Sequence, residues 1–62
     1  MSPERIASAI ESLHPLLDSG FTVGYAGGSC LQVWHGHKMR YIAIESIESA
    51  EDPCLYVRDV LA

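Results

Sequence analysis

Basic residues are scarce in this 62-residue chain, which has four lysines and arginines against eight aspartates and glutamates. The formal net charge of −4 arises entirely in residues 45–62, because the acids and bases of residues 1–44 balance one another. Proteins that bind nucleic acid directly, or that lie on an anionic membrane, present a basic surface to the phosphates. The charge therefore argues against both kinds of partner. It favours either a basic protein partner or an acidic face that only keeps the protein soluble.

Long hydrophobic runs are also missing. No stretch approaches the roughly 20 apolar residues of a membrane span, and residues 1–5 contain no apolar signal core. We therefore expect a cytoplasmic protein in which Cys30 and Cys54 stay reduced. The length allows one small domain, residues 1–62. Because 48% of the residues are apolar, we expect either that a partner or a second copy covers part of the surface, or that an apolar patch stays exposed.

No motif in the chain fixes a chemistry. His35 and His37 flank Gly36 in an expected turn, and they are too few for zinc, which needs three or four ligands. Residues 24–29 lack the Gly-Lys-Ser/Thr ending of a phosphate-binding loop, and a strand rather than a helix is expected after them. Cys30 is followed by two histidines, but a thiolate nucleophile also needs an orienting group and an oxyanion pocket. We therefore expect a protein that is not an enzyme and has neither a metal nor another cofactor.

Three β-prone runs occupy residues 21–45, with glycine-centred turns expected at residues 27–29 and 36–37. Their alternation predicts a three-stranded antiparallel meander. Its inward side chains would be Phe21, Val23, Leu31, Val33, Ile42 and Ile44. Its outward side chains would be Gln32, Trp34, Met39 and Tyr41. A slip of one residue in register would instead turn Trp34 into the core. Exposed aromatic side chains anchor protein interfaces, so Trp34 and Tyr41 are candidate contact residues.

A helix is expected on the N-terminal side of the meander. Ser2 and Pro3 suit its N-cap and its first position. Apolar residues then recur every three or four positions, which is the period of one helical face, at Ile6, Ala9, Ile10, Leu13 and Leu17. This face would pack on the inner side of the sheet. Pro15 should kink or break the predicted helix, residues 3–18.

A second helix is expected at the C-terminus, over residues 53–61, because Asp52 and Pro53 suit an N-cap and a first helical position. Residues 54–57 would also suit a fourth strand. Residues 46–52 have the character of a loop or a single helical turn. The predicted fold class is therefore α+β, with the order αβββα.

Acidic side chains follow the predicted sheet. If residues 45–52 are helical, Glu45, Glu48 and Asp52 share one face. Such a row of carboxylates could imitate a phosphate backbone towards a groove lined by lysine and arginine. The candidate partner-binding residues are therefore Trp34, Tyr41, Glu45, Glu48, Glu51, Asp52 and Asp59.

In size, acidity and lack of a catalytic set, the chain resembles the small acidic inhibitors that bacteriophages and mobile elements encode, such as anti-CRISPR proteins. No motif carries the resemblance, so no functional residue is transferred by it. The resemblance implies a cytoplasmic inhibitor that occupies a basic, nucleic-acid-binding surface of a partner complex. The alternative is a small accessory protein that forms a homodimer through the exposed face of its sheet.

Overall fold

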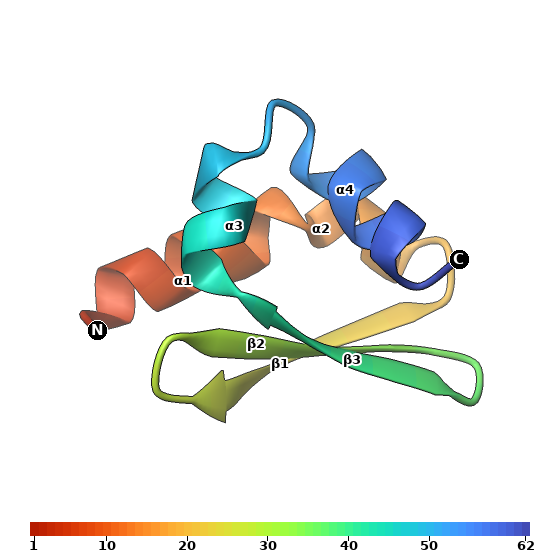
Figure 1. Ribbon diagram of the computed structural model, residues 1–62, viewed down its shortest axis with the longest axis horizontal. Helices are drawn as coiled ribbons and strands as arrows, with labels where there is room; N and C mark the ends of the chain where they lie inside the picture. The colour runs from red at the N-terminus through yellow and green to blue at the C-terminus, as the bar shows by residue number, and fades with distance from the viewer.

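The computed structural model describes all 62 residues. Four helices lie on one side of a single antiparallel sheet with the strand order β1-β2-β3 (Figure 1). The elements, in chain order, are α1 (Pro3–Ser12), α2 (His14–Leu17), β1 (Phe21–Gly27), β2 (Cys30–His35), β3 (Lys38–Ala43), α3 (Ile44–Ser49) and α4 (Pro53–Val60). This confirms the predicted α+β class and the αβββα order. The N-terminal helix is broken in two, and a short extra helix precedes the last one.

The break between α1 and α2 falls at Leu13, whose φ of −100° and ψ of 7° are not helical. Its cause is Pro15, because a continuous helix would push the proline ring against the carbonyl of Glu11. The break changes which side chain faces inward. Leu16 is completely buried, whereas 42% of Leu17 is exposed. The prediction that Leu17 packs on the sheet is therefore wrong, since it continued one helical period across the proline.

The meander agrees with the predicted strands and turns. Gly28 and Gly36 lie in the two hairpin turns with φ of 58° and 65°, a conformation that favours glycine. The pairing places Val33 opposite Val23 and Leu31 opposite Ile42. Directly opposed residues share a sheet face, so these four side chains point toward the helices. Phe21, Leu31, Val33 and Ile42 are buried, and Val23 is half-buried.

The third strand ends earlier than predicted, at Ala43, and Ile44 begins α3. The N–H of Ile44 donates to the carbonyl of Ser29 at 2.8 Å, which ties this junction to the first hairpin turn. Ile44 and Ile47 are both buried. A strand would send side chains three residues apart to opposite faces, whereas a helix keeps both on one face. The prediction of a strand to residue 45 is therefore wrong. The segment 46–52, predicted as a loop or a single turn, forms the rest of the six-residue helix α3 as far as Ser49 and then a loop over residues 50–52.

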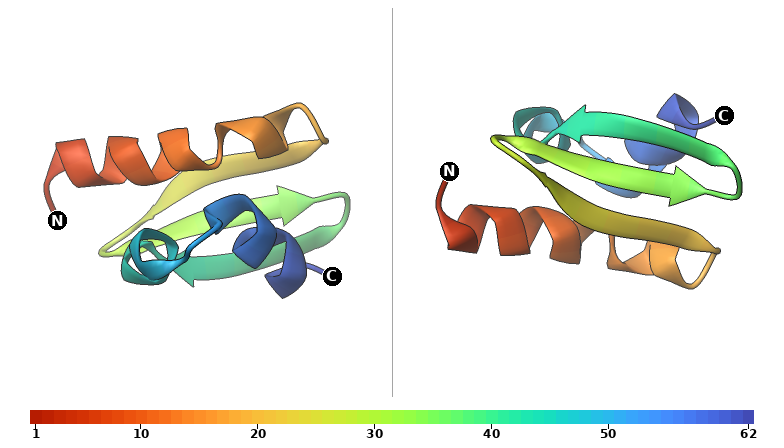
Figure 2. Two further views of the ribbon diagram at one scale, coloured as in Figure 1. Left: turned by 90° about the horizontal axis from the view of Figure 1, so that it is seen from above. Right: turned by 90° about the horizontal axis from the view of Figure 1, so that it is seen from below.

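The last helix forms as predicted, and the alternative fourth strand does not. Asp52 is its N-cap and accepts a hydrogen bond from the N–H of Leu55 at 3.2 Å, with Pro53 in the first turn. Val57 and Leu61 complete the core of eleven buried residues. As Figure 2 shows, α1 and α2 lie over the β1 side of the sheet and α3 and α4 over the β3 side. The opposite face of the sheet is covered by no element.

Candidate functional site

The uncovered side of the sheet carries no charged residue. Its outward positions follow from the strand pairing, because they alternate with the buried residues of each strand. They form what we call the open face: Thr22, Gly24, Cys30, Gln32, Trp34, Met39, Tyr41 and Ala43. Charged residues make up 19% of the chain, yet none lies among these eight. Covering an uncharged surface with another protein costs less hydration free energy than covering a charged one.

Aromatic side chains dominate the open face. Trp34 is 36% exposed and Tyr41 is 63% exposed, as the predicted register required. A Cβ atom added to Gly24 would lie 3.7 Å from Cζ3 of Trp34, so the indole ring lies against the backbone of β1. The amide of Gln32 donates to the hydroxyl of Tyr41 at 3.4 Å. Side chains that contact one another before binding lose less conformational entropy when a partner covers them.

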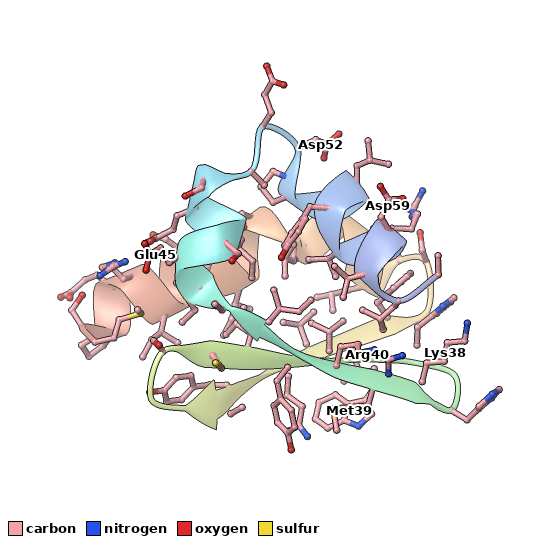
Figure 3. The ribbon with its side chains drawn as sticks, in the orientation of Figure 1. Lys38, Met39, Arg40, Glu45, Asp52 and Asp59 are labelled. Atoms are coloured by element: carbon pink, nitrogen blue, oxygen red, sulfur yellow. The ribbon has the colours of Figure 1, made fainter.

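The two cations of β3 point to the other side of the sheet. Lys38 and Arg40 alternate with Met39 and Tyr41 along the strand, so they flank the helix layer rather than the open face. Figure 3 shows Met39 on the side of the sheet that faces away from the helices. The open face consequently offers aromatic, thioether, amide and hydroxyl groups and no ion.

The acidic candidates lie in the opposite layer, on α3, on α4 and in the loop between them. Figure 3 shows Glu45, Asp52 and Asp59 on the helical side of the molecule. The expectation that Glu45, Glu48 and Asp52 share one helical face is wrong, because α3 ends at Ser49 and Asp52 follows a loop. The structure therefore separates Trp34 and Tyr41 from the acids and does not form a continuous row of carboxylates.

Glu48 is engaged in holding the fold together. Its carboxylate accepts from Nε of Arg5 at 3.0 Å and from Nη2 of the same guanidinium, which joins α3 to α1. These hydrogen bonds, followed by the charge of Arg5, hold the pKa of Glu48 below its usual value although partial burial opposes them. The same pair raises the pKa of Arg5. The pair is a fork of two parallel hydrogen bonds between the two helices.

The Arg5–Glu48 pair leads to a prediction of how the stability of the fold depends on pH. Folding lowers the pKa of the Glu48 carboxyl, so this group stabilises the fold at any pH above its unfolded-state pKa, which is 4.5. The stabilisation is lost as the pH falls through the lower pKa of the folded state. We expect Glu48→Gln to reduce the midpoint of urea unfolding slightly at neutral pH, since exposed ion pairs contribute little. The difference from the wild type should shrink as the pH falls below 4.5.

The matched control is Glu51→Gln, which removes one acid from the loop before α4 without touching Arg5. The two glutamine variants change net charge equally, so only the loss of the pairing distinguishes them. If both variants shift the urea midpoint by the same amount at every pH, the Arg5–Glu48 pair does not stabilise the fold.

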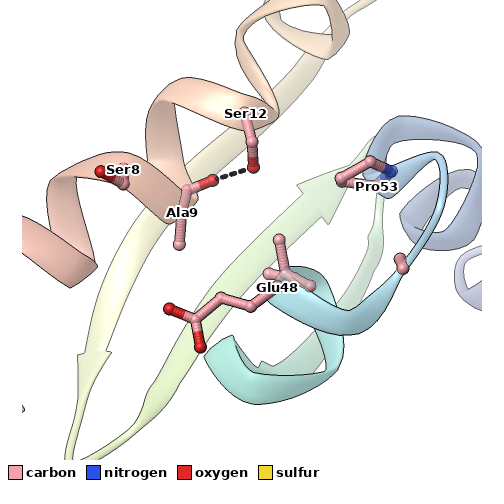
Figure 4. A pocket seen from close by; sticks show the side chains of 7 residues that line it. Ser8, Ala9, Ser12, Glu48 and Pro53 are labelled. Carbon is pink, nitrogen blue, oxygen red and sulfur yellow. Dashed lines mark hydrogen bonds between the residues drawn. The ribbon is translucent and has the colours of Figure 1, made fainter.

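Two hollows lie in the helix layer. The first, of about 180 Å³, lies between α1 and the α3–α4 segment and is lined by Ser8, Ala9, Ser12, Ile47, Glu48, Ala50 and Pro53 (Figure 4). The hydroxyl of Ser12 donates to the carbonyl of Ala9 at 2.7 Å, and the carboxylate of Glu48 is paired with Arg5. The hydroxyl of Ser12 and the carboxylate of Glu48 are thus already engaged within the protein.

The second hollow is a shallow groove of about 380 Å³ beside the first turns of α4. It is lined by Ala50, Glu51, Asp52, Leu55, Tyr56 and Asp59, and we call it the α4 groove. Leu55 is 53% exposed and Tyr56 is 36% exposed. Three carboxylates therefore surround an apolar floor. In the sequence, Val57 and Leu61 are one helical turn apart and mark the inward face of α4. Leu55 and Tyr56 fall outside that face, so helical spacing could have predicted their exposure.

The residues considered for catalysis or metal binding do not assemble. Cys30 and His35 lie at opposite ends of β2, and their positions alternate to opposite faces of the sheet. The ring of His35 stacks on Phe21 with a centroid separation of 4.0 Å. No group of three or more histidine, cysteine, aspartate or glutamate side chains is placed to hold a metal ion. None of the four helices has the length and apolar character that a membrane crossing requires.

Comparison with models of protein families, with curated proteins and with solved structures gives no match for this chain. Two surfaces of the structure that are open to a partner are the open face and the α4 groove.

Proposed function

We propose that this chain is a non-enzymatic protein-binding module and that the open face is its contact surface. The observation that carries the proposal is an uncovered sheet face with eight outward positions and no charge, on which Trp34, Met39 and Tyr41 stand together. The cores of protein interfaces are depleted in charged residues and enriched in aromatic residues and methionine. Tryptophan and tyrosine are also the residues that most often carry the binding energy.

A protein partner fits this surface better than a nucleic acid. Bases can stack on exposed aromatic rings, but such sites combine the rings with cations that follow the phosphate backbone. Here Lys38 and Arg40 flank the other side of the sheet, and the chain as a whole carries a net charge of −4. The open face thus provides stacking rings without the cations that phosphates need.

The test is the capture of proteins from a cell extract by the purified chain, measured for the wild type and for Trp34→Ser. Truncating a central interface residue costs about 2 kcal/mol or more, so we expect roughly 30-fold weaker capture of the specific partner. Tyr56→Ser is the matched variant, because Tyr56 has the same 36% exposure but lies in the opposite layer. Capture that is indifferent to both Trp34→Ser and Tyr41→Ser would overturn the proposal.

A second candidate is inhibition of the anti-CRISPR type, in which acids of the chain occupy a basic surface of a partner complex. The α4 groove favours it, because Glu51, Asp52 and Asp59 surround the exposed Leu55 and Tyr56. Attraction between exposed charges is screened by salt. We expect Tyr56→Ser and high salt to abolish the capture of partners that bind the α4 groove. Trp34→Ser should leave their capture unchanged. If no captured protein behaves in this way, the basic-surface candidate is wrong.

A further inference from the structure

We propose that the free edge of β1 binds an extended, uncharged peptide segment of a partner protein as a fourth strand of the sheet. In this mode of recognition the main-chain hydrogen bonds supply the affinity. The inference goes beyond the open-face contact, because it depends on backbone groups and not on Trp34 or Tyr41. The strand order β1-β2-β3 makes β1 and β3 the two edges of the sheet, and the structure distinguishes the two edges.

The backbone of β1 has unpaired groups along its free edge. A two-residue turn joins β2 to β3, so the flanking pair, His35 and Lys38, exchanges N–H and C=O bonds. Successive residues of β2 face β3 and β1 in turn, so the next residue, Trp34, bonds to Thr22 of β1. The same alternation along β1 leaves the N–H and C=O groups of three residues pointing to the free edge: Phe21, Val23 and Tyr25. No other backbone or side-chain group of the chain bonds to them.

The edge of β3 is protected, whereas that of β1 is not. Met39 also points its backbone groups to a free edge, but Nη1 of Arg40 donates to the carbonyl of Met39 at 2.8 Å. Lys38 and Arg40 point to the helix side of β3, and inward-pointing charges on an edge hinder the addition of a strand. β1 contains neither a charge nor a proline. Its one bulge, between Tyr25 and Gly27, lies at the far end of the strand.

The helix layer favours a single strand over a second copy as the occupant of this edge. Figure 2 shows α1 and α2 beside β1 on the side away from β2, so these helices project past the free edge. A strand added about 4.8 Å beyond β1 would lie beneath them. Antiparallel pairing of two β1 edges around a two-fold axis would put the helices of both copies on the same face of the joined sheet. Their projecting helices would then meet above the paired strands, whereas a segment without a helix layer avoids this collision.

The neighbours of the added strand define its side chains. Opposed residues of paired strands share a face, so the side chain opposite Val23 would point to the helices and the one opposite Thr22 would extend the open face. Ser8 and Ala9 of α1 face α3 across the first hollow, so the half-buried Ile10 lies toward the free side of β1. The segment that fits is therefore roughly five residues long. It alternates apolar side chains toward α1 with small uncharged side chains toward the open face.

Hydrogen exchange followed by nuclear magnetic resonance tests the inference, with the capped peptide Val-Thr-Val-Thr-Val as the probe. In the free protein, the amides of Phe21, Val23 and Tyr25 should exchange readily, whereas those of Thr22 and Gly24 should be protected by their bonds to β2. The peptide should slow exchange at the first three amides roughly tenfold when about nine-tenths of the protein is bound, since only the free protein then exchanges them.

Backbone N-methylation, introduced by chemical synthesis, distinguishes an added strand from a side-chain contact. N-methylation of Val23 blocks an N–H that bonds to nothing in the chain, so the fold is kept. The dissociation constant of the peptide should rise about tenfold or more. N-methylation of Met39 is the matched control, because this N–H points to the free edge of β3, and it should leave the dissociation constant unchanged. The amide spectrum of each variant checks its fold.

The inference is overturned if millimolar peptide does not slow exchange at the three β1 amides, or if the two N-methyl variants weaken binding equally. Spectral changes at the same amides when the protein alone is concentrated would show that a second copy occupies the edge, which would also overturn it. If the peptide fails to bind while capture of a partner requires Trp34, only this inference fails. If the peptide binds β1 but capture ignores Trp34 and Tyr41, only the proposed open-face contact fails.

Discussion

Leu16→Ala should unfold much of the protein, whereas Leu17→Ala, one residue later, should leave it folded. Leu16 is completely buried against the sheet and Leu17 is 42% exposed. Truncating a buried leucine costs about 2–5 kcal/mol, and native domains have only about 5–15 kcal/mol in total, with small ones at the low end. Urea unfolding followed by circular dichroism measures both variants. The expected result is a folded population that is greatly reduced for Leu16→Ala and nearly unchanged for Leu17→Ala.

The two variants control for one another. Both replace leucine by alanine within the four-residue helix α2, so the change in helix propensity is nearly the same. Only the direction of the side chain differs. The reverse order of stabilities would mean that the helical period of α1 continues through Pro15, which would contradict the break at Leu13.

Ile47→Ala is expected to have the second large effect. Ile47 is 1% exposed and, with Ile44, anchors a helix of six residues. A helix this short is not stable by itself, so α3 depends on its packing. We expect a loss of about 2–5 kcal/mol in the free energy of unfolding. In the part of the population that stays folded, hydrogen exchange of the α3 amides should accelerate.

Leu55→Ala is the control for Ile47→Ala, because it removes a side chain of similar volume from a position that is 53% exposed. It should change the free energy of unfolding by a small fraction of the Ile47 value. Equal effects of the two substitutions would show that α3 is not held by Ile47. The buried side chain of Ile44 would then have to be the main attachment of α3.

The sheet and the surface that it exposes could be predicted from the sequence because both depend on local rules. Two-residue alternation identified the buried side chains of the strands, and glycine positions identified the turns. The same alternation put Trp34 and Tyr41 on one face. The absence of charge from that face is visible in the sequence once the register is fixed, since Lys38 and Arg40 occupy the alternate positions of β3.

The features that could not be predicted arise where one local rule stops or where distant residues meet. The break before Pro15 changes the inward residue from Leu17 to Leu16, and its position depends on how α1 packs. At Ile44 the period changes from two to about 3.6 within a run of apolar residues, so the strand appeared longer than it is. The pairing of Arg5 with Glu48 joins residues 43 positions apart, and no spacing rule reaches so far.

The candidate partner-binding residues lie in two separate layers of the molecule, the sheet and the helices. Glu48 and Asp52 serve the fold, as an ion pair and as a helix cap, which leaves Glu45, Glu51 and Asp59 as acids without such roles. The open face contributes no residue to the buried core.

Trp34 is the single tryptophan of the chain, and it lies within the open face. Its fluorescence therefore reports directly whether that face is covered. The decisive measurement is acrylamide quenching of this fluorescence, in the free protein and after a captured partner protein is added. We predict ready quenching of the free protein, and protection with a blue-shifted emission once the partner covers the open face. Quenching that is equally strong with and without the partner protein would contradict the account.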